Sequence, residues 1–280
     1  MTTPRDDPIV PAPGTRLHGP AFGIDVGGTG VKAALVDLAS GTLLSSRVRL
    51  KTPAPATPEA VAETIRLVVE GVAAEVDVPS DIPVGCGLPG VVKHGRLLTA
   101  ANIDKSWIDA PVAEIVGRSI GRPVHALNDA DAAGVAEMAL GAGRDMGGTV
   151  LLLTIGTGIG SALFIDGALV PNTELGHLEL GETDAEIQLS GAARERRGLS
   201  WREWAEEFNV YLARIELYLW PDLLIFSGGV SKSIDRYSAH LRTRAPVVPA
   251  HFLNAAGIIG AALSAAAAAS PGTDVAPTAG

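Results

Sequence analysis

Apolar residues along this chain fall into short continuous runs and helically spaced series, and glycine-rich turns separate many of them. The runs at 21–26 and 31–36 read as strands joined by a tight turn at 27–30. A third strand is predicted over 43–50. The chain therefore opens with a β-hairpin and not with a βαβ unit.

A helix is predicted directly after the proline-rich connection that follows this hairpin. Thr57 is a good N-cap, Pro58 suits the first helical position, and Glu59 places an acid in the first turn. Helical spacing then continues through the apolar residues Val61, Ile65, Val68, Val69 and Val72.

The same strand–turn–strand plan, followed by helix–strand pairs, occurs twice. Further strands are predicted over 82–88, 123–127, 149–155, 161–165 and 222–226, and helices over 112–120, 130–140 and 201–220, near 231–241 and over 254–268. No strict sequence repeat accompanies this plan, so it indicates duplicated architecture only.

We predict an α/β chain of two domains. The small domain spans 21–128 and is joined by the returning helix 254–268, while the large domain spans 129–253. Residues 1–20 are expected to be a flexible N-terminus and 269–280 a disordered tail. The boundary places Asp129 in the cleft between the domains, where ligand sites are common.

Composition excludes some classes of partner but does not assign an activity. The chain has 280 residues, 47% of them hydrophobic, and a net charge of −9. That charge argues against nucleic acid or an anionic membrane as partner. A local glycine-rich loop can still bind phosphate on a negative protein.

Cysteine content and the absence of long apolar segments indicate the cellular compartment in which the protein is expected. Cys86 is the only cysteine, which excludes an intramolecular disulfide and a cysteine-rich zinc site. The first twenty residues lack the apolar core of a signal peptide, and residues 255–269 are too short to span a bilayer. A cytoplasmic protein is expected.

Catalytic chemistry is expected at Asn128 and Asp129, where a short apolar strand ends. A carboxylate in such a position, with an amide beside it, can hold a hydroxyl and accept its proton. Glu174 and His177 can face one ligand, although a histidine of this kind is more often structural. Glu186 could complete a hydroxyl-binding set, or it belongs to a solvated acidic face.

Three glycine-rich turns are candidate phosphate sites. At the first turn, 25–30, backbone N–H groups can approach phosphate and Asp25 can hold Mg²⁺, but a plain hairpin turn fits equally. The second, 156–160, begins like a dinucleotide fingerprint, yet a strand follows where that fingerprint requires a helix. The third, 227–229, leads from a strand into a helix, which favours an anion or is an ordinary turn. Cations near these loops are Lys32, Lys51, Lys105, Arg144 and Lys232, each more often plain surface charge.

Taken together and in order, these motifs resemble the ROK family of sugar kinases and repressors. The resemblance rests on 25–32, 128–129, 155–160, 174–177 and 227–231. It covers about residues 21–268 and implies the duplicated, ribonuclease H-like fold shared with actin and hexokinase.

The resemblance implies a role for each motif residue. Asp129 would be the general base toward the sugar 6-hydroxyl, and Asp25 would lie near Mg²⁺, directly or through water. The sugar would be held by Gly90, Asn102, Asn128, Asp129, Glu174, His177 and, less securely aligned, Glu186. The phosphoryl donor would be held by Gly27, Gly28, Thr29, Gly30, Lys32, Gly156, Thr157, Gly158, Gly228 and Gly229.

One departure from the family pattern refines the expected activity. Typical members carry a cysteine-rich zinc motif just after the position of His177, and here 178–186 contains no cysteine. That segment, with 192–204 and 217–229, resembles the polyphosphate-using glucokinases of actinobacteria. The expected reaction is phosphorylation of glucose by inorganic polyphosphate and also ATP, with mannose accepted by some related enzymes.

Alternatives remain within and outside this class. An ATP-only glucokinase or glucomannokinase is poorly separated by sequence, and a sugar-binding regulator without catalysis is disfavoured by Asp129. A repressor is disfavoured because about twenty residues precede the first strand, too few for a helix-turn-helix domain. The family also implies a homodimer. Trp201, Trp204, Phe208 and Tyr211 on the helix 201–220 are either exposed aromatics or core.

Overall fold

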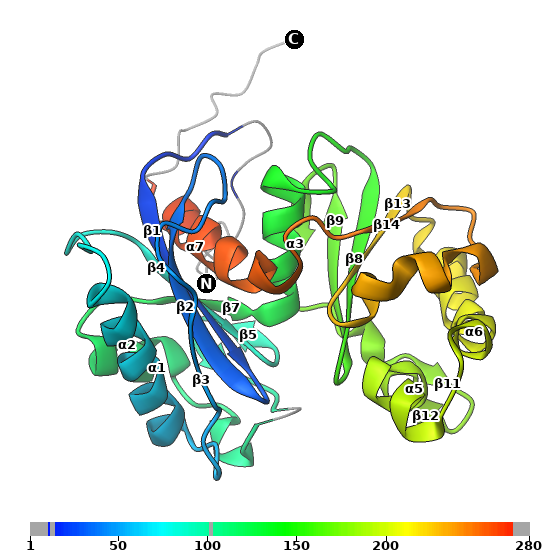
Figure 1. The fold of residues 1–280 in the computed structure, drawn as a ribbon, viewed down its shortest axis with the longest axis horizontal. Helices are drawn as coiled ribbons and strands as arrows, with labels where there is room; N and C mark the ends of the chain where they lie inside the picture. Colours follow the sequence, from blue (N-terminus) through cyan, green and yellow to red (C-terminus); the bar gives the residue numbers. More distant parts are fainter. Residues whose placement is uncertain (1–10, 12–14, 101–102, 271–280) are drawn as a thin grey trace, which may run out of the picture.

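The computed structural model describes residues 11, 15–100 and 103–270, and shows two five-stranded sheets side by side (Figure 1). Asn102, most of the N-terminal segment 1–20 and the tail from 271 lie outside the described residues. The predictions made for them, and the division into domains, stay predictions.

The first sheet has the strand order β3-β2-β1-β4-β7. Its strands are β1 (Pro20–Gly27), β2 (Gly30–Asp37), β3 (Val48–Leu50), β4 (Val84–Leu88) and β7 (His125–Asn128). β1, β2 and β3 are antiparallel, whereas β4 pairs in parallel with β1 and β7. Helices α1 (Pro58–Ala73) and α2 (Val112–Ile120) share a hydrophobic core with this sheet. A small hairpin, β5 (Val92–Lys93) and β6 (Arg96–Leu97), follows β4.

The second sheet repeats the plan with the order β10-β9-β8-β13-β14. Its strands are β8 (Thr149–Ile155), β9 (Ile159–Ile165), β10 (Ala168–Val170), β13 (Leu223–Ser227) and β14 (Val247–Pro249). The first three are antiparallel, and β13 pairs in parallel with β8 and β14. The long helix α6 (Trp201–Leu219) packs on one face. Two sheets of the same design confirm the predicted duplication.

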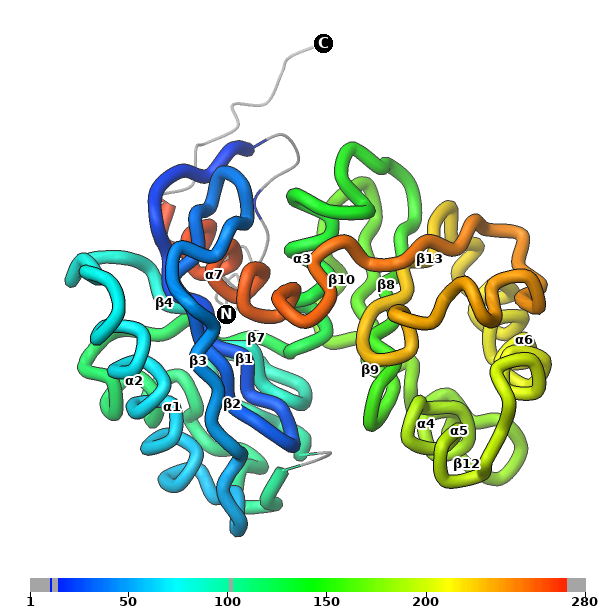
Figure 2. Tube along the Cα trace, in the orientation of Figure 1, coloured from blue at the N-terminus to red at the C-terminus, as the bar shows by residue number. Residues whose placement is uncertain are grey.

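Two helices, α3 (Asp129–Leu140) and α7 (Ala256–Ala269), lie between the sheets (Figures 1 and 2). Their contact is a backbone contact, because a Cβ on Gly260 would lie 1.6 Å from the Ala132 carbonyl oxygen. Helix α7 lies equally close to the first sheet, since a Cβ on Gly85 would lie 1.9 Å from the Ala261 oxygen. Small residues on both helices therefore allow one continuous core to reach across the molecule.

Shorter elements complete the chain and build the edge of the second half. These are β11 (Glu179–Leu180), β12 (Thr183–Asp184), α4 (Ala185–Leu189), α5 (Gly191–Arg197), and the 3₁₀ helices η1 (Lys105–Trp107), η2 (Leu175–His177), η3 (Val230–Arg236), η4 (Ser238–His240) and η5 (Leu253–Ala255). Among the described residues, no helix has the length and apolarity needed to cross a membrane.

Two predicted elements were wrong in extent. The strand expected over 43–50 is reduced to Val48–Leu50, because the Ser45 hydroxyl accepts a hydrogen bond from the Leu35 N–H in place of a strand partner. The helix expected near 231–241 is two short 3₁₀ helices with a kink at Ser233. The sequence argument for an anion at Gly228 and Gly229 required the N-terminus of an α-helix, and the structure has the 3₁₀ helix η3 there instead.

The aromatic residues of α6 answer the question that the sequence left open. Trp204, Phe208 and Tyr211 are fully buried, with Trp204 stacked on Phe208 and Phe208 edge-on to Tyr211, so they are core. The exposed apolar side chains of α6 are Val210, Leu217 and Tyr218, and Trp220 follows directly.

Candidate active site

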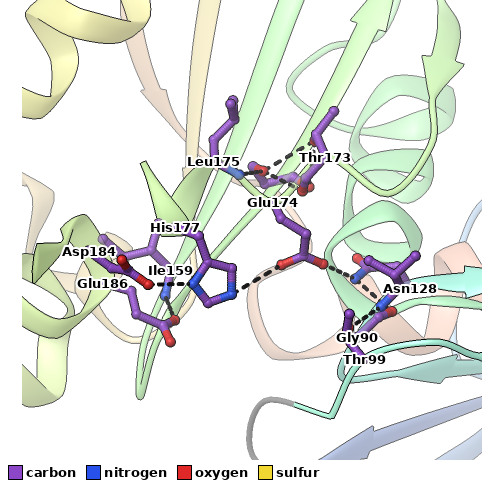
Figure 3. Close-up of polar contacts among 12 residues, drawn as sticks. Gly90, Thr99, Asn128, Ile159, Thr173, Glu174, Leu175, His177, Asp184 and Glu186 are labelled. Carbon is purple, nitrogen blue, oxygen red and sulfur yellow. Dashed lines mark hydrogen bonds and ion pairs between the residues drawn. The ribbon is translucent and has the colours of Figure 1, made fainter. Parts of the chain in front are cut away.

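Asp129 opens α3 where β7 ends, and its neighbour Asn128 fixes this position. The Asn128 side-chain oxygen caps the helix by accepting from the N–H groups of Ala130 and Asp131, at 2.8 and 2.9 Å. The Asn128 amide donates to the Gly90 oxygen at 3.1 Å and lies 3.5 Å from Glu174 Oε1. Asn128 thus connects two other predicted sugar-binding positions, Gly90 and Glu174, as Figure 3 shows.

The electrostatics of Asp129 suit a general base. Burial, followed by the nearby negative charge of Asp25 and then of Glu174 and Asp131, raises its pKa to about 7, although the Ala130 N–H opposes the shift. A base acts most efficiently when its pKa lies near the working pH. The carboxyl group can therefore accept a hydroxyl proton close to neutrality.

Glu174 and His177 lie across from Asn128, on the other half of the molecule (Figure 3). His177 Nδ1 is 2.8 Å from Asp184 Oδ2, and its Nε2 is 3.9 Å from Glu174 Oε2. The hydrogen bond to Asp184 raises the pKa of His177, and burial raises the pKa of Glu174. The imidazole is held from one side, which leaves its other nitrogen directed toward the site.

We expect Asp184→Ala to raise KM for glucose about tenfold with a smaller change in kcat, because His177 loses the partner that orients its ring. Asp184 precedes α4 but makes no side-chain capping bond, so its loss removes no cap. The matched control is Glu179→Ala, the exposed residue paired with Asp184 in the β11–β12 hairpin. Steady-state kinetics in glucose would test this, and an equal KM in both variants would contradict it.

Glu186 lies beside both the second glycine turn and the Glu174–His177 pair (Figure 3). Its Oε2 accepts from the Ile159 N–H at 3.0 Å, and a Cβ on Gly158 would lie 2.3 Å from the same oxygen. Glu186 therefore stabilises the second glycine turn through its side chain. Its contact with a sugar stays a prediction.

The first glycine turn is a tight hairpin in which Gly27 and Gly30 are paired across Gly28 and Thr29. The Thr52 hydroxyl donates to the Gly27 oxygen at 2.6 Å, and Arg49 Nη2 donates to the Thr29 oxygen at 3.0 Å. The plain hairpin geometry is thus present. Sequence reasoning missed Arg49, whose guanidinium lies beside this turn.

Lys32 and Asp25 form an ion pair at the end of the same hairpin, with 2.6 Å between Nζ and Oδ2. Lys32 is therefore engaged with the expected metal-binding carboxylate. Among the described residues no cluster of three or more His, Cys, Asp or Glu side chains could hold a metal ion. A single carboxylate still fits Mg²⁺, which usually combines one or two carboxylates with phosphate oxygens and water.

The second and third glycine turns come together. Gly156, Thr157 and Gly229 line one cavity of about 330 Å³, with further residues from α5, α6 and η3. Gly228 is not in the lining, but it has a φ of +78° and a Cβ there would lie 2.6 Å from the Ile155 oxygen. The structure thus requires glycine where the two turns meet.

A hydrogen-bonded bridge that no sequence motif indicated joins the two halves near the sugar-binding positions. The Asn172 side chain accepts from the Val92 N–H at 2.8 Å and donates to the Val92 oxygen at 3.0 Å. The buried Asp131 carboxylate holds Asn172 in turn, accepting from its N–H at 2.7 Å. Asp131 follows Asp129 by two residues and Asn172 precedes Glu174 by two, so the bridge links the two halves beside both candidate residues.

The remaining candidate cations are absent from the lining of the cavity at the second turn. Arg144 lies 3.7 Å from Asp145 and lines a separate cavity of about 650 Å³ near the N-terminal segment. Lys51, Lys105 and Lys232 are exposed, and none of them lines the cavity at the second turn.

Two sheets of duplicated topology, with the Asp129 carboxylate on a helix between them and a glycine turn in each sheet, are typical of sugar kinases of the actin-like, hexokinase-like class. The ROK family profile matches residues 21–191. The chain belongs to the ROK family.

Relatives and solved structures agree with this family. The chain is 47% identical over 258 residues to a polyphosphate glucokinase of Mycobacterium tuberculosis, covering 92% of this chain and 94% of the relative. It resembles the crystal structure of the inorganic polyphosphate/ATP-glucomannokinase of Arthrobacter sp. strain KM, with a TM-score of 0.86, 50% identity, and coverage of 89% and 99%. A ROK family glucokinase of Streptomyces griseus, solved with glucose and AMPPNP, gives a TM-score of 0.75 and 27% identity, with coverage of 87% and 98%.

Proposed function

We propose that this protein phosphorylates glucose at the 6-hydroxyl, with inorganic polyphosphate or ATP as donor. The observation that carries the proposal is the Asp129 carboxylate, whose pKa is raised to about 7 between the two glycine-turn regions. The resemblance to a polyphosphate glucokinase and to a polyphosphate/ATP-glucomannokinase supports the choice of acceptor and donors.

Each group of residues in the site has its own role in the phosphoryl transfer. Asn128, Glu174 and His177, with Gly90, hold the sugar hydroxyls so that the 6-hydroxyl faces Asp129. Asp129 accepts the proton as the hydroxyl oxygen attacks the terminal phosphoryl group in line. Backbone N–H groups of the turns at 27–30 and 156–158 stabilise the charge on the donor phosphates.

Mg²⁺ is the metal that Asp25 would hold, and when bound it would neutralise charge on the donor phosphates. Asp25 is well placed for this role, since its carboxylate is largely buried and already pairs with Lys32. The ion pair holds the Asp25 side chain at the base of the first turn.

One assay tests the function directly. Purified protein is incubated with glucose and Mg²⁺, with either ATP or long-chain polyphosphate, and glucose 6-phosphate is measured. Turnover with both donors supports the full proposal. Turnover with ATP alone would reduce it to an ordinary glucokinase, and no turnover with either donor would contradict it. Mannose replaces glucose in a parallel reaction to test the second acceptor.

The raised pKa of Asp129 predicts an acid limb in the pH profile. The base acts only as a carboxylate, so kcat/KM for glucose should fall about tenfold per pH unit below about pH 7 and level off above it. Initial rates at low glucose concentration across this range would measure the limb. A kcat/KM that stays flat down to about pH 5 would show that Asp129 titrates near its ordinary pKa.

We also infer a homodimer in the cytoplasm. The exposed apolar side chains at the end of α6, Leu217, Tyr218 and Trp220, support a protein contact there. The single cysteine, Cys86, is a buried free thiol, which suits a reducing compartment.

A further inference from the structure

The cavity at the second glycine turn contains polar groups that the proposed reaction has not used. Besides Gly156, Thr157 and Gly229, it is lined by Gly191, Ala192, Arg194, Glu195, Trp201, Val230 and Ser233. None of the sugar-binding positions is among these residues. The cavity therefore suits the part of the donor that lies away from the transferred phosphoryl group.

Arg194 and Trp201 form a fixed pair on the wall of this cavity. The Arg194 guanidinium carbon lies 3.8 Å from the centre of the Trp201 ring, and Tyr237 stacks on the same indole at 5.3 Å. Arg236 approaches the ring at 5.7 Å. A cation held against an aromatic ring is oriented without an anion to neutralise it.

The hydrogen-bonding capacity of this pair is unfilled. Arg194 Nε and Trp201 Nε1 are both buried without a hydrogen-bond partner among the described residues. By contrast, Arg196 donates to the Ile187 oxygen at 2.9 Å, and Arg197 pairs with Glu207 at 2.7 Å. Of the three arginines of α5, Arg194 alone makes no hydrogen bond or ion pair through its side chain in the described structure. These two nitrogen atoms are themselves shielded, but Arg194 lines the cavity and brings an unpaired positive charge to any ligand bound there.

We propose that Arg194, oriented by Trp201, binds phosphate groups of the polyphosphate chain beyond the one transferred, and so favours polyphosphate over ATP. This inference rests on the proposed kinase function and names one cationic contact for its donor. A guanidinium is the side chain best suited to phosphate oxygens. The carboxylate in the lining, Glu195, is exposed and can turn to solvent.

The same geometry disfavours a nucleobase as the principal ligand of the pair. A guanidinium and a phenol ring already pack on Trp201, so the indole offers little free face for base stacking. Arg194 is an unpaired cation in the lining, and the continuing phosphates of polyphosphate are anionic acceptors. A polyanionic chain therefore complements Arg194 better than an uncharged adenosine group does.

The test variant is Arg194→Met, which keeps the apolar stem against Trp201 and removes the charge. The control is Arg196→Met, on the same short helix, whose exposed guanidinium contacts only the Ile187 oxygen. We expect Arg194→Met to lower kcat/KM for long-chain polyphosphate by roughly tenfold or more, as for loss of a charge-assisted hydrogen bond. The loss with ATP should be several-fold smaller, KM for glucose should stay constant, and the control should match the unaltered protein.

Titration calorimetry with polyphosphate alone separates this inference from the kinase function. Weaker binding by Arg194→Met supports the contact even if the unaltered protein shows no polyphosphate turnover, an outcome that would overturn only the function. Equal losses with both donors would indicate that Arg194 only stabilises the second glycine turn, and this result would overturn the inference. A larger loss with ATP, or unchanged polyphosphate binding and turnover, would overturn it as well. Thermal unfolding of both variants checks that the fold is retained.

Discussion

Asp129→Asn is expected to lower kcat by about two to four orders of magnitude, the usual contribution of a general base. The asparagine keeps the size and position of the side chain at the start of α3, but it cannot accept the proton of the sugar 6-hydroxyl. KM for glucose should change much less, because Asn128, Glu174 and His177 still hold the other hydroxyls. Single-turnover measurement of glucose 6-phosphate would separate this chemical step from product release.

Stability provides the control for this variant. The folded pKa of Asp129, about 7, lies above the ordinary value of 3.8, so the folded state binds more protons between these two pH values. Ionised Asp129 therefore costs stability, and the cost grows as pH rises through that window. Asp129→Asn should unfold at the same or a higher temperature than the unaltered protein at pH 8. The exposed Asp145→Asn should alter neither rate nor stability. Near-normal turnover in Asp129→Asn would refute the base assignment.

Gly260→Ala is expected to reduce the free energy of unfolding by about 3 kcal/mol or more, or to prevent folding. The added Cβ would lie 1.6 Å from the Ala132 oxygen and 3.1 Å from the Ala136 nitrogen, both backbone atoms of α3. No side-chain rotation can relieve such a contact. The two central helices would have to separate, and the core they share with both sheets would open.

Gly71→Ala in α1 is the matched substitution for this test, since it also lies in a helix. Its Cβ would meet Val48 Cγ1 at 3.1 Å, a side-chain atom that can move. Alanine also favours the helix over glycine by up to about 1 kcal/mol, so little net change is expected. Urea unfolding of both variants gives the comparison. Equal stabilities would show that α3 and α7 can move apart at little cost.

Local sequence signals predicted local structure well. Thr57 caps α1 by accepting from the Ala60 N–H, and Gly121 ends α2 in the left-handed conformation, both as expected. Ser200 and Glu203 even form a full capping box at the start of α6. Each signal depends on atoms within four residues along the chain, so it can be recognised from the sequence alone.

Features that depend on distant atoms were the ones missed. The hydrogen bond that Glu186 accepts from the Ile159 N–H joins residues 27 positions apart, which sequence spacing cannot reveal, and the contact of Glu186 with a sugar stays a prediction. Asn172 lies in a loop without a motif, and its bridge to Val92 spans eighty residues. Arg194 resembles the neighbouring arginines in sequence and differs only in what it packs against. Asn102 lies outside the described residues.

The packing of α7 on β1 and β4 has a consequence during synthesis of the chain. The sheet face beside Gly23 and Gly85 is covered by backbone near Ile258 and Ala261, which emerge from the ribosome about 170 residues later than β4. At typical elongation rates of about 5–20 residues per second, that face of the sheet stays exposed for roughly ten to thirty seconds before α7 is synthesised. The first half of the nascent protein therefore persists for that time as an incomplete, aggregation-prone intermediate that chaperones can bind.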